Sequence, residues 1–533
     1  MKSYPLHIDG QDVEGDRWIY VVRSSAFLED PKPAFDLKRS LELNRGAVPT
    51  DDVVARCALG GMDANDAAVR AARKASRAWG RTPQAVRSRI VVEFNRRLAA
   101  RADELIEILI AEGHPRRLAQ WEVSGMLCGT DEATIRWYES QLHQTFESQG
   151  RRIDLVRKPD GVVCVNPPQN AAGSNSTMGI FALLAGNTLV VKAPRSSPLS
   201  VMFVYRELLV PILQEHGAPP GTVNLICGPA AGILRDWVSN PLVDDILFFG
   251  DSPAGLKLGE ECLRNGKKAV LELAGNDGFV VWRDADLDAA ARALEESFYG
   301  SSQICMVPKY AVVHPAVAEE FLDLFVERVR KLRPGQPEDP EVLLSPVLKV
   351  DRFFDFKAEA LGAGGRLLCG GERVGLDGLE SPTGLFCEPT VIRLDGLERA
   401  RGLSVVGEET FFPLLPVIVP DEDSDERLFE AVVDFLDGNA YGLRNSLWTR
   451  DEDLVDRFAT EVGNGGQLKI NDSHIGFSPI LSTHGGNRQT GGPYGELNYA
   501  GLRTTHLQGI VRGTGDPRPL DPRVLTTTEK ADD

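Results

Sequence analysis

Two side chains could carry covalent and acid–base chemistry. Cys305 ends the polar stretch Ser301-Ser-Gln-Ile-Cys, which follows a predicted helix. A thiolate in such a loop is a nucleophile, although a lone cysteine is more often a small buried apolar residue. Glu272 lies in Ala269-Val-Leu-Glu-Leu-Ala274, whose apolar residues predict a buried strand. Burial would raise the pKa of this carboxyl and suit it to accept a proton near neutral pH, whereas an edge strand would expose it to water.

Two glycine-containing turns could bind a phosphate group. Gly250-Asp-Ser-Pro-Ala-Gly255 has the glycine spacing of a Walker loop but lacks the Lys and Ser/Thr that should follow, and Gly228-Pro-Ala-Ala-Gly232 lacks the third glycine of a dinucleotide fingerprint. Both sequences are also typical of ordinary strand-to-helix turns. Because each is expected at the start of a helix, its backbone N–H groups and the helix dipole could still hold a phosphate.

Short apolar strands that alternate with helices would position these residues. Strands are predicted at residues 162–165, 188–192, 222–226, 245–249, 269–273 and 279–282, and helices at 197–216 and 253–265. This alternation predicts an α/β fold with a parallel sheet, whose ligands bind beyond the carboxyl ends of the strands.

A second series of elements predicts a second domain between about residues 284 and 460. Its helices are expected near 285–298 and 316–332, and its strands near 309–313, 389–392 and 415–419. Nearer the N-terminus, apolar residues three and four apart predict helices at 64–77 and 87–113. Residues 24–58 contain three prolines and little periodicity, so they are predicted to be irregular, and the tail after about residue 514 is predicted to be extended.

Composition narrows the class of protein. The chain has 533 residues, 42% of them apolar and 26% charged, which predicts a soluble globular protein of more than one domain. A net charge of −18 disfavours binding to nucleic acid and to acidic membranes. The eight cysteines form no CxxC unit and the eight histidines no HExxH motif, so we expect reduced thiols, no metal site and a cytoplasmic location.

Six stretches together resemble the aldehyde dehydrogenase superfamily in order and spacing. They are Gly161–Asn170, Leu184–Lys192, Phe248–Gly250, Leu271–Gly275, Gln303–Cys305 and Glu408–Pro413. The resemblance runs from Ile8-Asp-Gly10 to His484-Gly-Gly486 and Gly501-Leu502, and only residues 24–58 and the tail lack a clear counterpart. It implies a Rossmann-like cofactor domain, an α/β catalytic domain and a small oligomerisation element.

The resemblance also assigns roles to individual residues. It places the nucleophile on Cys305, the general base on Glu272 and the oxyanion-binding amide on Asn170. The cofactor NAD(P)⁺ would contact Pro168, Lys192, Arg195, Gly228, Gly232, Phe249, Gly250, Asp251, Leu273, Glu409 and Phe411. The substrate pocket would be lined by Trp121, Ala171, Met178, Phe477 and His484.

The implied activity is oxidation of an aldehyde to a carboxylic acid through a thiohemiacetal and a thioester on Cys305. Two alternatives remain open: a member that transfers the acyl group to CoA, and a dinucleotide-binding protein that has lost catalysis. The presence of Glu272 argues against the first, and the presence of Cys305, Glu272 and Asn170 together argues against the second. The chain departs from the family pattern at Ala171-Ala172 and Phe412, which predicts an unusual pocket. It also departs at Pro308-Lys309, which predicts that the second domain approaches the site differently.

Arg195 favours NADP⁺ over NAD⁺. Many NAD⁺-using relatives carry a glutamate at this position, three residues after the cofactor lysine, where it would repel a 2′-phosphate. A guanidinium there would attract the phosphate, unless the side chain turns outward to water.

We expect residues 1–140 and 160–275 to form the cofactor domain, 276–465 the catalytic domain, and 141–159 with 485–515 the oligomerisation element of a homodimer or homotetramer. Residues 516–533 would form the C-terminal tail.

Overall fold

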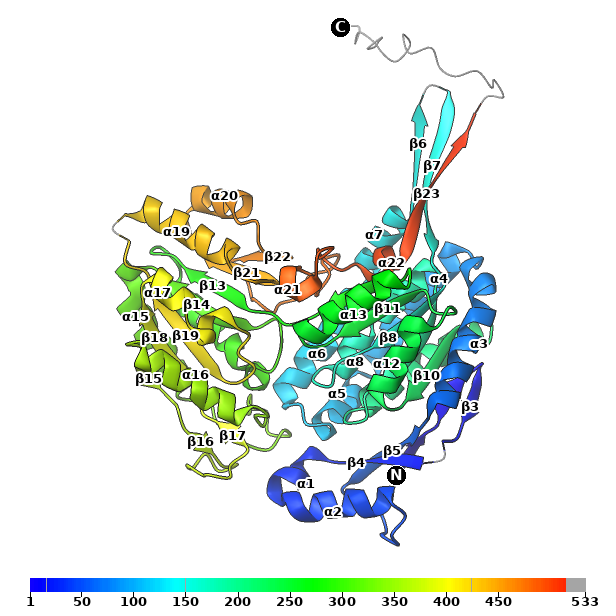
Figure 1. Cartoon of the computed structure of the whole chain (residues 1–533), viewed down its shortest axis with the longest axis horizontal. Coiled ribbons are helices and arrows are strands. Elements are labelled where there is room, and N and C mark those ends of the chain that lie inside the picture. The colour runs from blue at the N-terminus through cyan, green and yellow to red at the C-terminus, as the bar shows by residue number, and fades with distance from the viewer. Residues whose placement is uncertain (16, 149, 423, 514–533) are drawn as a thin grey trace.

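Two seven-stranded sheets with helices on both faces make up most of the molecule (Figure 1). A computed structural model describes residues 1–15, 17–148, 150–422 and 424–513. The predicted tail, 516–533, lies outside the described residues. The α/β fold predicted from the alternation of strands and helices is confirmed.

The first sheet has the strand order β12-β11-β8-β9-β10-β2-β3. Strands β8 to β12 run parallel, and β2 and β3 extend the sheet with antiparallel pairing. The bounds are β2 Leu6–Ile8, β3 Gln11–Val13, β8 Val162–Asn166, β9 Thr188–Ala193, β10 Val223–Cys227, β11 Asp245–Phe249 and β12 Lys268–Glu272. Every residue of β8 to β11 is buried, as expected for parallel strands covered on both faces.

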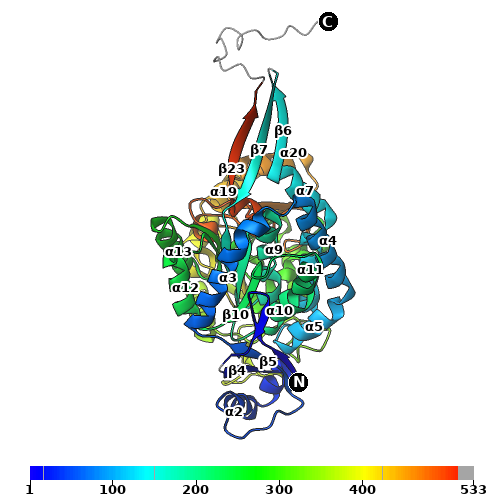
Figure 2. The same cartoon turned by 90° about the vertical axis from the view of Figure 1, so that its right-hand side faces the viewer.

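Helices α3 (Met62–Gly80), α12 (Ala230–Ser239) and α13 (Ser252–Arg264) cover one face of this sheet, and α4 (Gln84–Ala100) and α9 (Met178–Ala185) lie over the other (Figure 2). Helix α13 begins where the Asp251 carboxylate accepts a hydrogen bond from the Ala254 N–H at 3.0 Å, and it ends before Gly266, whose φ is +69°. The remaining helices around this sheet are α5 Ala102–Ala111, α6 Arg116–Gly129, α7 Glu132–Leu142, α8 Ala172–Ser176, α10 Leu199–Met202, α11 Val210–Glu215, α21 Arg488–Gly491 and α22 Ala500–Arg503.

The predicted helix 197–216 has a π-helical segment, Phe203–Leu209, between α10 and α11. Pro211 follows it and has no N–H to donate back into the helix, which is a common reason for such a bulge.

The second sheet has the order β15-β18-β19-β14-β13-β21-β22, with β15 antiparallel to its neighbour. The bounds are β13 Asp277–Val281, β14 Pro308–Val313, β15 Arg366–Cys369, β18 Thr390–Asp395, β19 Leu414–Val419, β21 Arg444–Trp448 and β22 Gln467–Ile470. Alternate residues of β13 enter different cores: Phe279 and Val281 pack with α14 (Leu287–Leu294) and α15 (Ala318–Val329), and Val280 packs on the opposite side.

That opposite side carries α16 Val350–Gly362, α17 Leu397–Arg401, α18 Ser404–Gly407, α19 Asp425–Asp437 and α20 Glu452–Glu461. Smaller elements are the 3₁₀ segments Glu295–Ser302 and Pro315–Val317 and the strands β16 Arg373–Val374, β17 Phe386–Cys387 and β20 Tyr441–Gly442.

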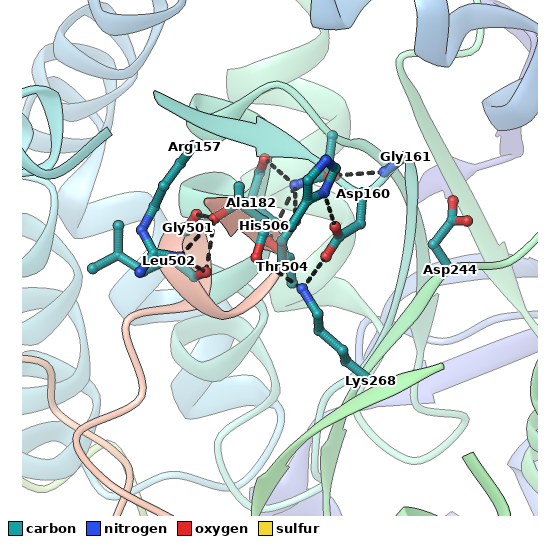
Figure 3. Close-up of polar contacts among 12 residues, drawn as sticks. Arg157, Asp160, Gly161, Ala182, Asp244, Lys268, Gly501, Leu502, Thr504 and His506 are labelled. Atoms are coloured by element: carbon teal, nitrogen blue, oxygen red, sulfur yellow. Dashed lines mark hydrogen bonds and ion pairs between the residues drawn. The ribbon is translucent and has the colours of Figure 1, made fainter. Parts of the chain in front are cut away.

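A three-stranded sheet projects from the body of the molecule (Figures 1 and 2). It consists of β6 (His143–Ser148), β7 (Arg151–Pro159) and β23 (Thr505–Arg512), all antiparallel. Figure 3 shows how its base is fixed: Lys268 at the start of β12 donates to Asp160 at 2.5 Å, and the Asp160 carboxylate also lies 2.7 Å from His506. Lys268 also donates to the Thr505 carbonyl at 2.8 Å. The projecting sheet is therefore tied to the edge of the first sheet.

Three expectations about the elements are wrong. Residues 24–58 are not irregular, because they contain α1 (Ser24–Glu29), α2 (Pro31–Glu42) and β5 (Val53–Leu59). The prolines misled the prediction, since Pro31 occupies the first turn of α2, where a missing N–H costs nothing. Strand β5 pairs with β1 (Lys2–Tyr4) and β4 (Arg17–Val22) in a separate sheet.

The helix predicted at 87–113 is two helices, α4 and α5, that meet at Arg101. The strand predicted at 279–282 corresponds to β13, which belongs to the second sheet and not to the first. Periodicity identifies a strand but not the sheet that it joins, which depends on contacts between residues far apart in the chain.

Candidate active site

The carboxyl ends of the parallel strands in the first sheet carry most of the expected site residues. Asn170 follows β8, Lys192 lies in β9 with Arg195 just beyond it, and Glu272 ends β12. Gly228 and Gly250 come directly after β10 and β11. The second sheet contributes Cys305, before β14, and Glu409, before β19. The candidate site thus draws on both sheets.

The loop before Cys305 has an unusual backbone. Gly300, Ser301 and Ser302 have φ values of +56°, +57° and +62°, a conformation that is costly for the two serines. The Ser301 hydroxyl compensates through hydrogen bonds with the Ser345 carbonyl at 2.5 Å and the Ser345 N–H at 2.9 Å. Strained backbone held in this way is common at functional sites.

Close backbone packing joins this loop to the first sheet at Gly275. A Cβ atom there would lie 2.1 Å from the Cys305 carbonyl oxygen, so only glycine permits the approach. The Gly275 N–H also donates to the Glu409 carboxylate at 3.1 Å. Gly275 therefore brings together Cys305, the expected nucleophile, and Glu409, which we expect to contact the cofactor.

Cys305 and Asn170 line one cavity. The Asn170 side-chain N–H₂ donates to the Gln303 carbonyl at 2.9 Å, which fixes the amide beside the Cys305 loop and leaves its second N–H free to donate. Burial raises the pKa of the Cys305 thiol to about 12; the Glu409 and Asp277 charges add to this effect, and the Lys309 charge opposes it.

Glu272 is buried at the end of β12. Its carboxylate accepts hydrogen bonds from the Gly485 N–H at 2.9 Å and the Asn498 side chain at 2.8 Å. Burial raises the pKa of this carboxyl to about 8, although both hydrogen bonds favour the charged form. The prediction from its apolar neighbours, a buried carboxylate that titrates near neutral pH, matches this environment.

The cavity also brings together all five residues expected in the substrate pocket. Trp121, Ala171, Met178, Phe477 and His484 share it with Cys305. The Trp121 and Phe477 rings pack 5.0 Å apart, and the Phe477 ring lies where a Cβ at Gly125 would be, so it fills space beside α6. Phe412, at a position that departs from the family pattern, packs in the core of the second sheet with Phe353 and Phe356.

Sequence reasoning missed a buried pair behind Asn170. His114 Nε2 lies 2.9 Å from the Asn170 carbonyl oxygen and 3.3 Å from a Glu122 carboxylate oxygen, while its Nδ1 faces the Leu109 carbonyl at 3.2 Å. Burial raises the pKa of Glu122, and the nearby His114 charge opposes that shift. No local motif marks this pair, because its two members belong to different elements.

Lys309 is a second group whose role the sequence did not indicate. It is fully buried, and its ammonium donates to the Ser302 carbonyl at 2.6 Å and to the Thr410 carbonyl at 2.9 Å. It lies 5.4 Å from the centre of the Phe411 ring. Burial lowers the pKa of Lys309 to about 8. The ammonium thus ties the Cys305 loop to the Glu409–Phe411 segment. In the sequence, the departure from the family pattern at Pro308-Lys309 was the signal that could have identified this role.

The residues that we expect to contact the cofactor differ in their exposure and in the contacts that they make with the protein. Lys192 is 3% exposed, and within the described residues its ammonium has no hydrogen bond or ion pair. Asp251 caps α13, and Leu273 packs where a Cβ at Gly255 would be. Arg195 is exposed, Pro168 and Gly232 are partly exposed, Gly228 and Phe249 are buried, and Gly250 is exposed at its turn.

These features fit a dinucleotide. A buried ammonium without a protein partner is costly unless a ligand supplies hydroxyl or anionic groups. Lys192 is such an ammonium, and it lies near the carboxyl end of β9, where cofactors of such sheets bind.

Comparison with known proteins shows the family. The model of the Aldehyde dehydrogenase family matches residues 40–508. The chain is 31% identical over 450 residues to a probable succinate-semialdehyde dehydrogenase [NADP(+)] of Sinorhizobium fredii, covering 81% of this chain and 85% of that protein. It is 28% identical over 529 residues to a 3,6-anhydro-alpha-L-galactose dehydrogenase of Vibrio sp., covering 95% and 99%.

Solved structures agree in fold. A crystal structure of an NAD-dependent aldehyde dehydrogenase from Sinorhizobium meliloti superposes with a TM-score of 0.80 over 97% of this chain and 96% of that one, at 24% identity. PnpE from Pseudomonas sp. WBC-3 gives a TM-score of 0.78 at 26% identity, covering 97% and 99%. With this fold, this site and a family match over most of its length, the chain belongs to the aldehyde dehydrogenase family of enzymes.

Proposed function

We propose that this enzyme oxidises an aldehyde to a carboxylic acid with NAD(P)⁺, with Cys305 as nucleophile, Glu272 as base and Asn170 as oxyanion donor. The observation that carries the proposal is the shared cavity, in which a thiol from one sheet meets an amide from the other. The alternative of a protein without catalysis is disfavoured, because all three groups are present and Cys305 and Asn170 share one cavity.

Cys305 begins the reaction by adding its sulfur to the aldehyde carbon. The thiol releases its proton to solvent water as the C–S bond forms, and the carbonyl π electrons move onto the oxygen, which becomes negative. The free Asn170 N–H and the Cys305 backbone N–H stabilise this oxygen by donating hydrogen bonds. NAD(P)⁺, when bound, would supply the nicotinamide that accepts the hydride from this carbon, and Cys305 would then hold the acyl group as a thioester.

Glu272 completes the cycle by activating water. Its carboxylate takes a proton from a water molecule, whose oxygen attacks the thioester carbonyl; the C–S bond breaks, and the sulfur leaves as thiolate. A pKa of about 8 means that the basic form of Glu272 becomes more populated as the pH rises toward 8. The acid is released, and Cys305 is ready for another aldehyde.

A spectrophotometric assay tests this proposal against transfer to CoA. Absorbance at 340 nm is followed with an aldehyde and each cofactor, with and without CoA. We expect turnover that does not require CoA, because Glu272 is present to activate water. Turnover that appears only with CoA would show that the CoA thiol, and not water, accepts the acyl group. No turnover with any aldehyde would contradict the proposal.

The cavity lining favours uncharged aldehydes over anionic ones. Most of the lining is apolar, and none of the described residues that line it is a lysine or arginine. Among the described residues that line the cavity the one carboxylate is Glu122, and without a lysine or arginine there the burial of an anionic substrate group would be uncompensated. In a screen of aliphatic, aromatic and carboxylated aldehydes, we expect the lowest kcat/KM for the carboxylated ones, and the highest value there would contradict this assignment.

Arg195 supports a preference for NADP⁺. Its guanidinium is exposed and, among the described residues, makes no hydrogen bond or ion pair. No carboxylate occupies its position to repel a 2′-phosphate. The ratio of kcat/KM for the two cofactors tests this preference, and a wild-type preference for NAD⁺ would contradict it.

We also propose the division into domains given above, with the projecting sheet as the oligomerisation element of a homodimer or homotetramer. Three apolar side chains of this sheet are each at least half exposed: Phe146, Leu507 and Val511. Exposed apolar side chains of this kind favour contact with a second subunit. The outer strands also leave edges that another chain could pair with. Light scattering at micromolar concentration tests this proposal, and a monomer would contradict it.

A further inference from the structure

A surface cavity lies between the N-terminal helices and the cofactor side of the first sheet. It has a volume of about 550 Å³. Its walls include Phe27 and Phe35 from the helices and Gln169, Arg195 and Ser196 from the loops after β8 and β9. Helices α1 and α2, most of whose residues precede the part of the chain that the family model matches, therefore form a wall beside the residue that we expect to read the 2′ position.

Lys38 brings a second cation to this cavity. It projects from α2, and its ammonium donates to the Tyr20 carbonyl at 2.8 Å and lies 3.6 Å from the Glu42 carboxylate. Since an ammonium has three N–H groups, these contacts hold Lys38 in place and leave one donor. Burial lowers the pKa of Lys38, the Glu42 carboxylate opposes this shift, and the positive charge of Arg195 adds a smaller effect in the same direction as burial.

The two carboxylates on the cavity wall are already engaged by other groups. Glu112 accepts hydrogen bonds from the Leu199 N–H at 2.6 Å and the Ser200 N–H at 3.1 Å, which caps α10. Glu42 pairs with Lys38 and accepts a longer hydrogen bond, 3.4 Å, from the Tyr20 N–H. Among the described residues that line the cavity, the side chains that remain free to donate are those of Ser24, Gln169, Arg195 and Ser196, together with the third N–H of Lys38.

The position of α2 is fixed by its own small core. Tyr20, Val22 and Val53 of the N-terminal sheet are buried against Ala34 and Leu41 of the helix. Lys38 is therefore held by packing on one side and by the Tyr20 carbonyl on the other. A side chain positioned in this way loses little further freedom when it binds a ligand.

We propose that Lys38 and Arg195 together bind the 2′-phosphate of NADP⁺, so that the N-terminal helices form the outer wall of the adenosine site. This inference rests on the proposed function, since it assumes that Lys192 and Arg195 face the adenosine ribose. The phosphate accepts hydrogen bonds from the two cations, with the Ser196 hydroxyl as a further donor. No chemical step takes place there, and the pair determines which cofactor is selected.

Calorimetric titration with 2′,5′-ADP and 5′-AMP tests the proposal without catalysis, because the two probes differ only in the 2′-phosphate. The variants are Lys38→Gln, which keeps a donor for the Tyr20 carbonyl, Lys38→Met and Arg195→Met. Lys32→Met is the matched control, since Lys32 is an exposed lysine on the same helix that does not line the cavity. Circular dichroism verifies the folding of each variant.

We expect Lys38→Gln, Lys38→Met and Arg195→Met each to weaken 2′,5′-ADP binding by about tenfold, the typical effect of losing one charge-assisted hydrogen bond, and to leave 5′-AMP binding unchanged. Lys32→Met should change neither. Three results would overturn the role of Lys38. They are equal weakening of the binding of both probes by the Lys38 variants, no weakening of binding at all, and the same effect from Lys32→Met.

The failure of this inference is distinguishable from failure of the proposed function. A wild-type enzyme that oxidises aldehydes with NAD⁺ but binds the two probes equally keeps its function and lacks the phosphate site. An enzyme that binds neither probe and reduces neither cofactor loses both.

Discussion

The reacting end and the adenosine end of the proposed site hold their charges in opposite ways. Around Cys305, Glu272 and Lys309 are buried and Glu409 is partly buried, and desolvation displaces the pKa of each from its usual range. At the other end, Arg195 and Ser196 are exposed, and Lys38 is only partly buried. The reacting end holds its charges away from water, whereas the adenosine end leaves Arg195 and Lys38 in contact with water and buries Lys192.

This difference predicts where changes should be costly. Electrostatic interactions are strong and salt-insensitive where water is excluded, so small displacements at the reacting end should change the rate of chemistry. Exposed charges are screened, so changes at the adenosine end should alter the choice of cofactor and leave the chemical step intact. The predictions below begin with the largest expected effect.

Cys305→Ala should abolish dehydrogenase turnover and leave cofactor binding largely intact. The thiol forms the covalent bond, and the expected cofactor contacts lie on other loops. Steady-state assays measure the rate, and titration with the cofactor measures binding. Cys262→Ala is the matched control, because this buried cysteine lies in α13 away from the cavity. Turnover near wild type in Cys305→Ala would contradict the assignment of the nucleophile.

Asn170→Ala should lower kcat by about 10²- to 10³-fold, the typical loss of one oxyanion donor. Aldehyde turnover at saturating cofactor measures this change. Since the Asn170 carbonyl contacts His114 through the backbone, the substitution keeps that contact and removes only the amide. A loss well under tenfold would show that backbone donors suffice.

Lys309→Met should slow the reaction of Cys305 and move its pH profile upward. The Lys309 charge opposes the high pKa of the thiol, so its removal should raise that pKa further and reduce the thiolate at a given pH. Alkylation of Cys305 by iodoacetamide across pH measures the change, which we expect to be up to about tenfold for a shift of one unit. Lys349→Met is the control, because Lys349 also lies over the Phe411 ring but is exposed. An unchanged profile for Lys309→Met, or the same shift in the control, would show that Lys309 only supports the loop.

Added salt should produce the smallest effect and should act at one end only. Raising sodium chloride from 0.05 to 0.5 M, chosen to span the Debye lengths of dilute and concentrated buffer, should weaken 2′,5′-ADP binding several-fold. The rate of the chemical step in a single turnover with saturating cofactor should stay the same. A chemical step that is as salt-sensitive as probe binding would remove the contrast between the two ends.

The sequence predicted the parts of the fold and site that depend on local patterns. Each of the strands β8 to β12 contains a run of at least three apolar residues, and the turns after them contain glycine or proline, so their carboxyl ends were recognisable. The burial of Glu272 followed from its apolar neighbours. These signals are readable because each arises within about ten residues.

What the sequence could not predict depends on residues that are distant in the chain. His114, in the turn before α6, contacts Asn170 in the loop after β8. Lys309 donates a hydrogen bond to the Thr410 carbonyl, about a hundred positions further along the chain. The helix α2 was missed because its prolines suggested a loop, whereas its burial against Tyr20 and Val53 stabilises the helix. The cavity that it forms with Arg195 could only be found in three dimensions.

Trapping the thioester in Glu272→Gln tests the central claim most directly. The variant is mixed with an aldehyde and the preferred cofactor, quenched, and analysed by intact-mass and peptide mass spectrometry. We predict one equivalent of reduced cofactor and a stable acyl group on Cys305, because acylation precedes the step that needs the base. Multiple turnovers without a trapped acyl group, or an acyl group on another residue, would contradict the roles of Glu272 and Cys305.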